Sequence, residues 1–276
     1  MMNTQSHTFV ICAYKESPYL EECIHSLKGQ TKTSNICLAT STPSPYLEDM
    51  CRKYGLDYFV RNGKSNIADD WNFALSMAHT PYVTIAHQDD IYEPHYLEMI
   101  MQKAEQHEKK GKIPLILFSD YREIIGKKKY SDRKNLKIKR LLLSPLKRER
   151  GQGSRWRKRF SLKFGNAICC PSVTYHKAAI GKLLEQQGET DLFRKHFRSN
   201  LDWQTWEWLS RQNGEFVYIP QFLMGHRIHE DSETSATIRD NERGQEDFEV
   251  FCKFWPKGIA KVLSGVYKNS EKGNEI

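Results

Sequence analysis

Strands and helices are expected to alternate through the first 125 residues, and this alternation constrains the fold more than any other feature of the sequence. Short apolar, β-branched runs predict strands, and apolar residues at three- and four-residue spacing predict amphipathic helices between them. This β-α repetition is typical of an α/β fold with a mainly parallel sheet covered by helices. We expect strands at 8–14, 36–40, 57–60, 82–86 and 113–119, and helices at 20–27, 47–54, 67–78 and 94–104.

The rest of the chain divides into three parts. Residues 126–164 break the β-α rhythm and are predicted to form a basic, mobile insertion with short helices. Residues 165–235 become regular again and are predicted to complete the domain begun by residues 1–125, with a Trp-rich helix near 202–212. Residues 236–276 are predicted to be a C-terminal helical segment with a break at Pro256-Lys257-Gly258.

Composition excludes several classes of protein. The 276 residues are 39% hydrophobic and include 13 Tyr, 13 Phe and 6 Trp, so the chain can bury enough apolar surface to fold. No apolar run approaches the length of a membrane span, and the N-terminus lacks the basic and apolar regions of a secretory signal, so a cytoplasmic location is expected. The seven cysteines neither cluster nor form CxxC pairs, which favours reduced packing residues.

The net charge of +8 is concentrated in one segment. Between Lys127 and Lys163, sixteen Lys and Arg accompany only two acids, whereas the other residues carry 26 basic and 32 acidic side chains. Such a segment attracts phosphate groups. It is either a solvated loop, a contact for an anionic membrane surface or lipid-diphosphate acceptor aided by Leu141–Leu143 and Trp156, or a nucleic-acid contact. No nucleic-acid motif accompanies it, so we expect no nucleic-acid partner.

The pair Asp89-Asp90 follows a predicted buried strand. Ligands of such sheets bind at the carboxyl ends of the strands, so these carboxylates are expected to face the ligand crevice. A divalent cation bridged to a diphosphate gives two adjacent acids a use there. The alternative is that they cap the helix that begins near Pro94.

Two further segments carry reactive side chains. Asp202 begins a predicted helix, where it is either a helix cap or a general base. The run His226-Arg227-Ile228-His229 follows a strand. Its Arg suits bidentate contact with phosphate and its His suits a divalent metal, although a plain surface loop is the alternative.

The order of these segments resembles that of a family 2 glycosyltransferase of the GT-A fold. The resemblance covers about residues 5–125 well and 165–235 loosely, and five motifs in the right order carry it. They are Thr8–Leu27 (TFVICAYKESPYLEECIHSL), Ile67–Leu75 (IADDWNFAL), Tyr82–Pro94 (YVTIAHQDDIYEP, the DXD-type motif), Leu201–Leu209 (LDWQTWEWL) and Gly225–Ser232 (GHRIHEDS).

The resemblance implies a role for each matching position. Residues 1–125 would be the half that binds the nucleotide sugar, and residues 165–235 the acceptor-side half. Donor-binding residues would be Ala13, Tyr14, Glu16, Ser41, Asn72, Asp89 and Arg227, with Mn²⁺ or Mg²⁺ held by Asp90 and His229, the acceptor hydroxyl deprotonated by Asp202, and Asn166 and Ser172 on the acceptor side. The second strand ends in Thr40-Ser41-Thr42, where the family usually has an acid pair, so the base of the donor stays open.

These features predict an inverting, metal-dependent glycosyltransferase of the hexosyltransferase type. Its donor would be a nucleotide-diphosphate sugar, with a UDP-sugar favoured, and its acceptor a glycan or lipid-linked glycan in cell-surface polysaccharide synthesis. One alternative is a sugar-nucleotide nucleotidyltransferase, although the turn Ala13–Pro18 lacks the Gly-rich phosphate loop expected there. The other is a non-catalytic phosphate- or membrane-binding protein on a transferase fold.

Overall fold

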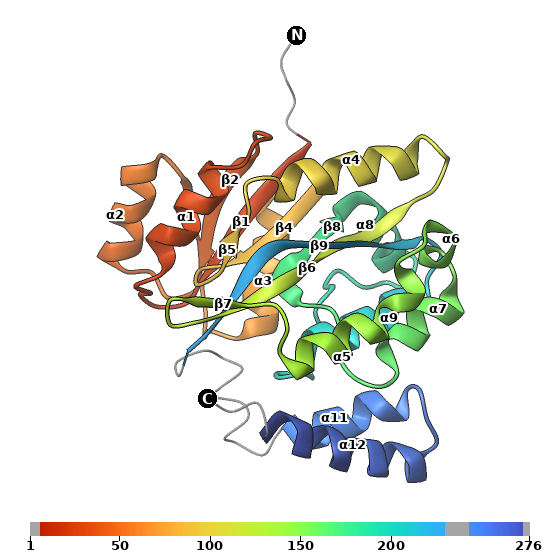
Figure 1. Ribbon diagram of the computed structural model, residues 1–276. Helices are drawn as coiled ribbons and strands as arrows, with labels where there is room; N and C mark the ends of the chain where they lie inside the picture. The colour runs from red at the N-terminus through yellow and green to blue at the C-terminus, as the bar shows by residue number, and fades with distance from the viewer. Residues whose placement is uncertain (1–5, 230–242, 273–276) are drawn as a thin grey trace.

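A central mixed β-sheet organises the computed structural model, which describes residues 6–229 and 243–272 (Figure 1). Nine strands of the described chain form this sheet, in the order β3-β2-β1-β4-β8-β6-β9-β5, with β7 pairing only with β6. Their bounds are β1 His7–Ala13, β2 Asn35–Thr40, β3 Asp57–Val60, β4 Tyr82–His87, β5 Ile91–Tyr92, β6 Pro114–Ile125, β7 Lys128–Tyr130, β8 Val173–His176 and β9 Glu215–Ile228.

The first four long strands confirm the predicted parallel arrangement. Strand β1 pairs in parallel with both β2 and β4, and β2 pairs in parallel with β3. Strand β8 runs antiparallel between β4 and β6, whereas β6 and β9 are parallel to each other. Because β1, β2 and β4 run the same way, their carboxyl ends meet at one edge of the sheet.

Helices cover both faces of the sheet. One hydrophobic core packs α1, α2 and α4 against one face, and a second core packs α3, α8, α9, α11 and α12 on the other. Alternate residues of β1 point to opposite faces, as the period of a strand requires, so Phe9 and Ile11 enter the first core and Val10 the second. The helices are α1 Leu20–Lys28, α2 Pro45–Tyr54, α3 Ile67–Met77, α4 Tyr96–Glu108, α5 Lys134–Leu142, α6 Glu149–Gln152, α7 Arg155–Leu162, α8 Lys177–Glu185, α9 Leu201–Ser210, α11 Arg243–Cys252 and α12 Lys257–Lys272.

Local sequence explains where the helices near the site begin and end. The side chain of Asn66 caps α3 by accepting hydrogen bonds from two backbone N–H groups of its first turn. Ser44 caps α2 in the same way, and Gly55 ends that helix in the left-handed conformation, with φ of 62°. These caps fix the connections that follow β2 and β3.

The basic segment is packed more closely than the mobile insertion expected for residues 126–164. It forms β7, α5, α6 and α7, and its leucines enter the cores of the molecule. Leu143, Leu146 and Leu162 join the core under α9, while Leu136 joins the other core. The short predicted helices are present because apolar residues recur among the cations at helical spacing.

The C-terminal part forms the expected broken helix. Helices α11 and α12 flank the predicted break at Pro256 and lie below the body in Figure 1, near α9. Phe251 and Tyr267 contact the ring of Trp203 in α9, with ring centroids 5.0 and 5.6 Å away. Where the structure describes the chain, no helix combines the length and hydropathy that crossing a bilayer requires.

Candidate active site

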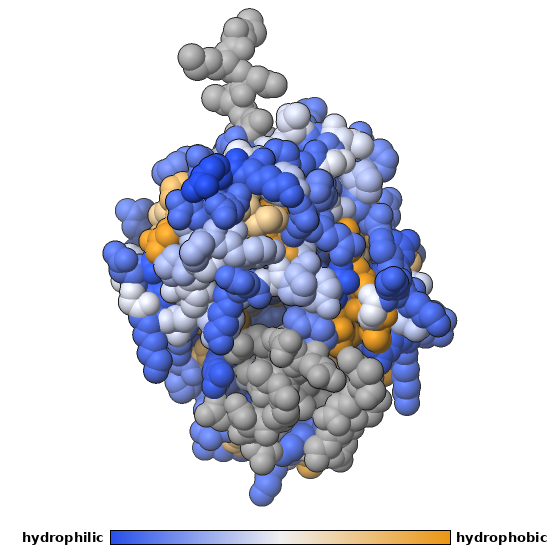
Figure 2. All heavy atoms as spheres, turned by 90° about the vertical axis from the view of Figure 1, so that its left-hand side faces the viewer, coloured by the Kyte–Doolittle hydropathy of each residue, from blue (hydrophilic) through white to orange (hydrophobic). Residues whose placement is uncertain are grey.

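The carboxyl ends of β1, β2 and β4 lie side by side. Ala13 pairs with Thr40 across β1 and β2, and Cys12 pairs with His87 across β1 and β4. The turns that follow these ends hold most of the residues predicted to bind the donor. The side of the molecule that lies on the left in Figure 1 is mostly hydrophilic and is hollowed near its centre (Figure 2).

The turn after β1 is held by its neighbours. Ala13 is buried, whereas Tyr14 and Glu16 are exposed. Lys15 adopts a left-handed conformation with φ of 56°, and its N–H donates to the Thr42 hydroxyl at 2.6 Å. This bend directs Tyr14 and Glu16 outward at the edge of the site.

Three polar atoms beside this turn are buried without a hydrogen-bond partner among the described residues. They are Ser41 Oγ after β2, His87 Nε2 at the end of β4 and Gln88 Oε1 in the next turn. The amide nitrogen of Gln88 donates to the carbonyl oxygen of Tyr14 at 2.8 Å, so this side chain links the two strand ends. Because buried polar groups are normally paired, these atoms are available to a polar ligand such as a nucleoside.

The structure does not give Asn72 a free side chain. Its amide donates to the carbonyl oxygen of Phe193 at 2.8 Å and accepts from the Phe193 N–H at 2.9 Å. Asn72 therefore ties α3 to a distant segment. Nearer the strand ends, Asp70 accepts hydrogen bonds from Arg61 and Ser65, at 2.8 and 3.0 Å.

His87, Asp89 and Asp90 form a cluster whose ligand atoms all lie within 4.8 Å of one another. Asp90 is fully buried. One of its oxygens accepts the backbone N–H of Arg227 at 2.8 Å, and His226 Nδ1 lies 3.1 Å from the same oxygen. Strand β9 therefore fixes the orientation of this carboxylate.

The pKa values of the two histidines near Asp90, His87 and His226, shift in opposite directions. Burial lowers the pKa of His87 despite the nearby carboxylates, so its imidazole is neutral and able to bind a metal. Burial also disfavours charge on His226, but Asp90 outweighs it and raises the pKa of His226. Two carboxylates and a neutral imidazole form a ligand set suited to a divalent cation.

His229 lies beside Asp89 rather than Asp90. Its Nε2 is 2.8 Å from the Asp89 carboxylate. Burial alone would raise the pKa of Asp89, but the hydrogen bond with His229 and the neighbouring histidines lower it below its usual value. The second candidate ligand beside Asp90 is therefore His87, which belongs to the same cluster. His229 instead forms a hydrogen bond with Asp89.

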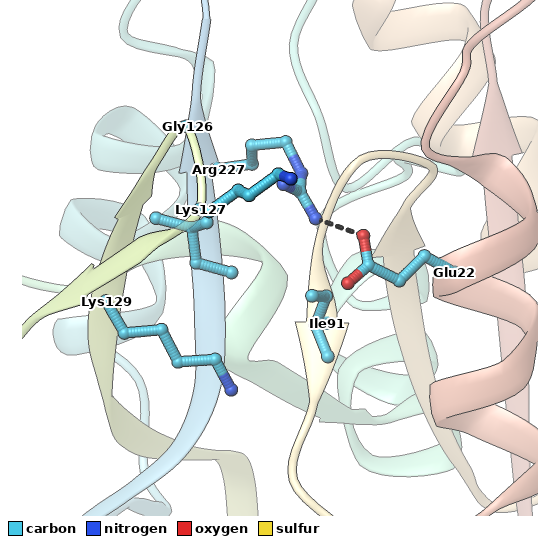
Figure 3. Close-up of a pocket in the computed structure, with 7 residues that line it drawn as sticks. Glu22, Ile91, Gly126, Lys127, Lys129 and Arg227 are labelled. Atoms are coloured by element: carbon cyan, nitrogen blue, oxygen red, sulfur yellow. Dashed lines mark hydrogen bonds and ion pairs between the residues drawn. The ribbon is translucent and has the colours of Figure 1, made fainter.

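Arg227 reaches from β9 to α1 across a hollow of about 330 Å³ (Figure 3). Its guanidinium donates to the backbone carbonyl of Asp89 at 2.8 Å and to the carboxylate of Glu22 at 2.6 Å. It also lies over the ring of Tyr19, 4.2 Å from the centroid. Arg227 therefore braces the turn that carries Asp89. The hollow is lined by Glu22, Ile91, Ile124, Gly126, Lys127, Lys129 and Arg227.

The structure brings together Asp202, the candidate base, and Asn166, a candidate acceptor-side residue. The Asn166 side-chain amide donates to one oxygen of the Asp202 carboxylate at 2.6 Å. The backbone N–H of Trp203 donates to the other oxygen at 2.7 Å. Burial raises the pKa of Asp202, and these two hydrogen bonds hold the rise back. The side-chain oxygen of Asn166, Oδ1, has no hydrogen-bond partner among the described residues, so it is available to a hydroxyl group.

Asp202 shares its surroundings with the acidic cluster. The charges of Asp90 and Asp202 both act on His87 and on the thiols of Cys169 and Cys170. Asp90 and Asp202 therefore have His87, Cys169 and Cys170 as common neighbours. Ser172 does not reach it, because this residue is fully buried and its hydroxyl donates to the carbonyl oxygen of Cys169.

Sequence reasoning missed several residues that shape the site. His226 lay inside the His-Arg-Ile-His run but was not selected, because the surrounding residues were not predicted to be a strand. Strand β9 instead continues through Pro220 to Ile228, which places His226 beside Asp90. Gln88 and Glu22 carried no signal in the sequence that could have found them.

Comparison with known proteins defines the class. Residues 8–165 match the sequence model for glycosyl transferase family 2, which is more than half of the chain. The chain belongs to this family and has the GT-A fold of glycosyltransferases. No protein with curated annotation matches it in sequence.

Solved structures with the same fold share little sequence with this chain. S. aureus TarS residues 1–349, in complex with UDP-GlcNAc, are 14% identical with a TM-score of 0.62, covering 92% of this chain and 72% of that one. The mannosyltransferase PcManGT from Pyrobaculum calidifontis, in complex with GDP-Man and Mn²⁺, is 12% identical with a TM-score of 0.63, covering 98% and 76%. A longer S. aureus TarS chain is 12% identical with a TM-score of 0.59; the match covers 88% of this chain but only 42% of that one.

Proposed function

We propose that the protein transfers a sugar from a nucleotide-diphosphate donor to a hydroxyl of a glycan or lipid-linked glycan, with inversion at the anomeric carbon. The observation that carries this proposal is that two carboxylate sites have His87 as a common neighbour. His87 belongs to the cluster with Asp89 and Asp90, and the charge of Asp202, which is held by Asn166, also acts on it. Transfer from a donor diphosphate to an acceptor hydroxyl needs two such sites close together.

The ligand set of the cluster fits a divalent cation, with Mn²⁺ favoured. His87 would supply a neutral nitrogen and the two aspartates would supply oxygens, whereas Mg²⁺ prefers oxygens alone. A bound divalent cation would neutralise charge that develops on the departing diphosphate. A GT-A neighbour that was solved with GDP-Man and Mn²⁺ supports this assignment.

Asp202 is the proposed general base. The acceptor hydroxyl would lose its proton to Asp202 as its oxygen bonds to the anomeric carbon and the bond to the diphosphate oxygen breaks on the opposite face. The raised pKa of Asp202 strengthens it as a base, and Asn166 orients its carboxylate. A single displacement of this kind inverts the anomeric centre.

Three residues on the donor side have polar atoms without a hydrogen-bond partner among the described residues. Ser41, Gln88 and His87 have unpartnered atoms, and Gln88 contacts the turn of Tyr14, where a base and ribose would lie. Hydroxyl and amide groups suit either a uracil or a guanine edge, and the fold neighbours bind UDP-GlcNAc and GDP-Man. We propose a UDP-sugar first, because Ser41 and Thr42 offer small hydroxyl donors and acceptors suited to a pyrimidine.

Titration calorimetry with UDP, GDP, dTDP and CMP, each with and without Mn²⁺, tests the proposal. We expect one nucleotide to bind only with metal, and Asp90→Asn to weaken that binding at least tenfold because it removes a ligand charge. Asp49→Asn, an exposed acid in α2, is the matched control and should bind as the wild type does. Absence of binding by all four nucleotides to folded protein would overturn the proposal.

A further inference from the structure

We infer that the outward faces of α5, α7 and α12 together form a docking surface for a membrane rich in anionic lipid. This inference goes beyond sugar transfer and does not depend on it. The basic segment, residues 127–163, takes little part in the candidate active site. Its helices expose aromatic and aliphatic side chains beside the Lys and Arg residues.

Helix α7 has an unusual outward face. Its buried side carries Lys158, Ser161 and Leu162, so the opposite side, around Trp156 and Phe160, faces outward. A surface helix normally carries polar residues at the centre of that side. Here Trp156 is 68% exposed, and an aromatic side chain occupies the place of a polar one.

The aromatic residues of this face form a continuous ridge, defined as Trp156, Phe160, Phe164 and Trp255. Successive ring centroids along it are 5.3, 6.1 and 5.5 Å apart. The ammonium of Lys163 lies 4.3 to 4.9 Å from the centroids of Phe160, Phe164 and Trp255. The ridge thus joins α7 to the start of α12 and carries a cation at its middle.

The neighbouring helices repeat the pattern. Helix α5 exposes Ile138 and Leu141 beside lysines, and α12 exposes a stripe of apolar residues one turn apart beside Lys257 and Lys261. Figure 1 shows α5 and α7 in the lower part of the body and α12 beneath it, with α11 between α12 and the body. Ten large apolar side chains of the described chain are exposed, and seven of them lie on α5, α7 or α12 or just after α7: Ile138, Leu141, Trp156, Phe164, Ile259, Val262 and Val266.

Charge identifies the occupant. Between Lys134 and Lys163 there are twelve Lys and Arg and a single acid, Glu149, which lies in ion pairs with Lys110 and Lys112. Six of these cations are exposed: Lys134, Lys137, Lys147, Arg148, Arg150 and Arg155. An anionic bilayer offers a negative surface for the cations and a hydrocarbon boundary for Trp, Leu and Val. Two helices and a ridge that expose apolar residues among lysines have the composition of interfacial membrane anchors.

Vesicle flotation tests this inference with the full chain and no donor or acceptor. We expect the protein to float with vesicles of phosphatidylcholine containing about one third phosphatidylglycerol, and to remain unbound with phosphatidylcholine alone. Added salt should release it, because exposed charges are screened. Equal flotation with both vesicles, or none with either, would overturn the inference.

Matched variants locate the contact. Trp156→Ala should weaken binding about tenfold, because the largest exposed apolar group is removed. Ile113→Ala, which is also exposed but lies at the start of β6, should bind as the wild type does. Lys137→Gln should weaken binding about fivefold, and Lys109→Gln, at the end of α4, should leave it unchanged. Unchanged binding by both Trp156→Ala and Lys137→Gln would contradict the assigned surface.

A competing outcome is also informative. The same cations and aromatic rings could bind single-stranded RNA through phosphate contacts and base stacking. A fluorescent RNA oligonucleotide should therefore be titrated beside the vesicles. Binding of the oligonucleotide at salt concentrations where anionic vesicles stay unbound would assign the surface to nucleic acid and overturn the membrane inference.

Discussion

At the scale of single residues, the site depends on how two carboxylates are held. Asp90 is buried and accepts a backbone N–H and a histidine hydrogen bond, so its position is fixed before any ligand arrives. Asp202 is held by Asn166 and by the Trp203 N–H, but burial raises its pKa. Asp90 is thus held in place by hydrogen bonds, and the raised pKa of Asp202 fits the general base that we propose.

Asp202→Asn should abolish transfer while the donor still binds. The amide keeps the shape of the side chain but cannot accept the acceptor proton, so turnover should fall by about 10²- to 10⁴-fold. Turnover is measured with the donor found by calorimetry, and the donor Kd is measured in parallel. Turnover near the wild-type rate would remove Asp202 from the role of base.

Asn166→Ala should move the acid limb of the pH–rate profile to higher pH. The Asn166 amide donates to the charged form of Asp202 and so lowers its pKa; removal of that hydrogen bond raises the pKa further. The base is then protonated over a wider acidic range. Profiles of kcat/KM for the wild type and the variant measure the shift.

Ser172→Ala is the control for this shift. The Ser172 hydroxyl is buried and donates to the Cys169 carbonyl, whereas the Asp202 carboxylate accepts from Asn166 and the Trp203 backbone. Its variant should keep the acid limb of the wild type. A profile that moves in Ser172→Ala and not in Asn166→Ala would reverse the assignment of the two residues.

At the scale of elements, α11 supports the helix that carries Asp202. The Glu246 carboxylate accepts the backbone N–H groups of Arg198, Ser199 and Asn200, each at 2.8 Å. These residues lead into α9, and a negative charge at a helix N-terminus is favourable. A C-terminal element thus holds the start of α9 only a few residues from the candidate base.

Glu246→Ala should lower kcat about tenfold and leave the donor Kd unchanged. The loss of three hydrogen bonds frees the start of α9, and a base that is displaced slightly loses much of its rate. Stability should also fall, by about 1–3 kcal/mol. Kinetics and thermal melts measure the two effects separately.

Glu249→Ala is the matched control, since Glu249 lies one turn further along α11 and pairs with exposed His196. It should leave kcat and the melting temperature near those of the wild type. A fall in kcat of similar size in both variants would show that α11 as a whole, and not its contact with α9, affects transfer.

At the scale of the whole molecule, buried polar groups link segments that are far apart in sequence. His7 at the start of β1 is buried, and its ring nitrogens lie 2.8 Å from Ser34 Oγ and 2.9 Å from Thr84 Oγ1. Burial lowers the pKa of His7 to about 3. A neutral imidazole therefore joins the start of β1 to β4 and to the loop before β2.

His7 should make the protein less stable as the pH falls below about 6.5. The unfolded chain takes up a proton at His7 near that pH, whereas the folded chain does not until the pH approaches its lowered pKa, so acid favours unfolding. The contribution lost by pH 5 is about 2 kcal/mol. Denaturant unfolding at pH 7 and pH 5 measures it.

His7→Gln should show a smaller loss of stability over the same pH interval than the wild type. His79→Gln, at an exposed position after α3, should show the same loss as the wild type. A His7→Gln variant with the full wild-type pH dependence would mean that other groups cause the acid destabilisation.

The sequence by itself predicted the strands and helices of the N-terminal half, the position of Asp89-Asp90 after a buried strand, and Asp202 at a helix start. These features are local, because the spacing of apolar residues over a short stretch of chain determines where helices and strands form and end. Apolar residues among the cations also predicted the short helices of the basic segment. The same periodicity did not show how closely these helices pack.

Only the tertiary structure decided which side chains meet. It placed His226 beside Asp90 by extending β9 through Pro220, tied Asn72 to Phe193, enclosed Ser172 in the core, and brought α7 against the start of α12. Each of these contacts joins segments distant in the chain or depends on burial by such segments. Periodicity reports which face of an element is apolar, but the partner of a polar side chain is set by how whole elements pack, and that is a property of the folded chain alone.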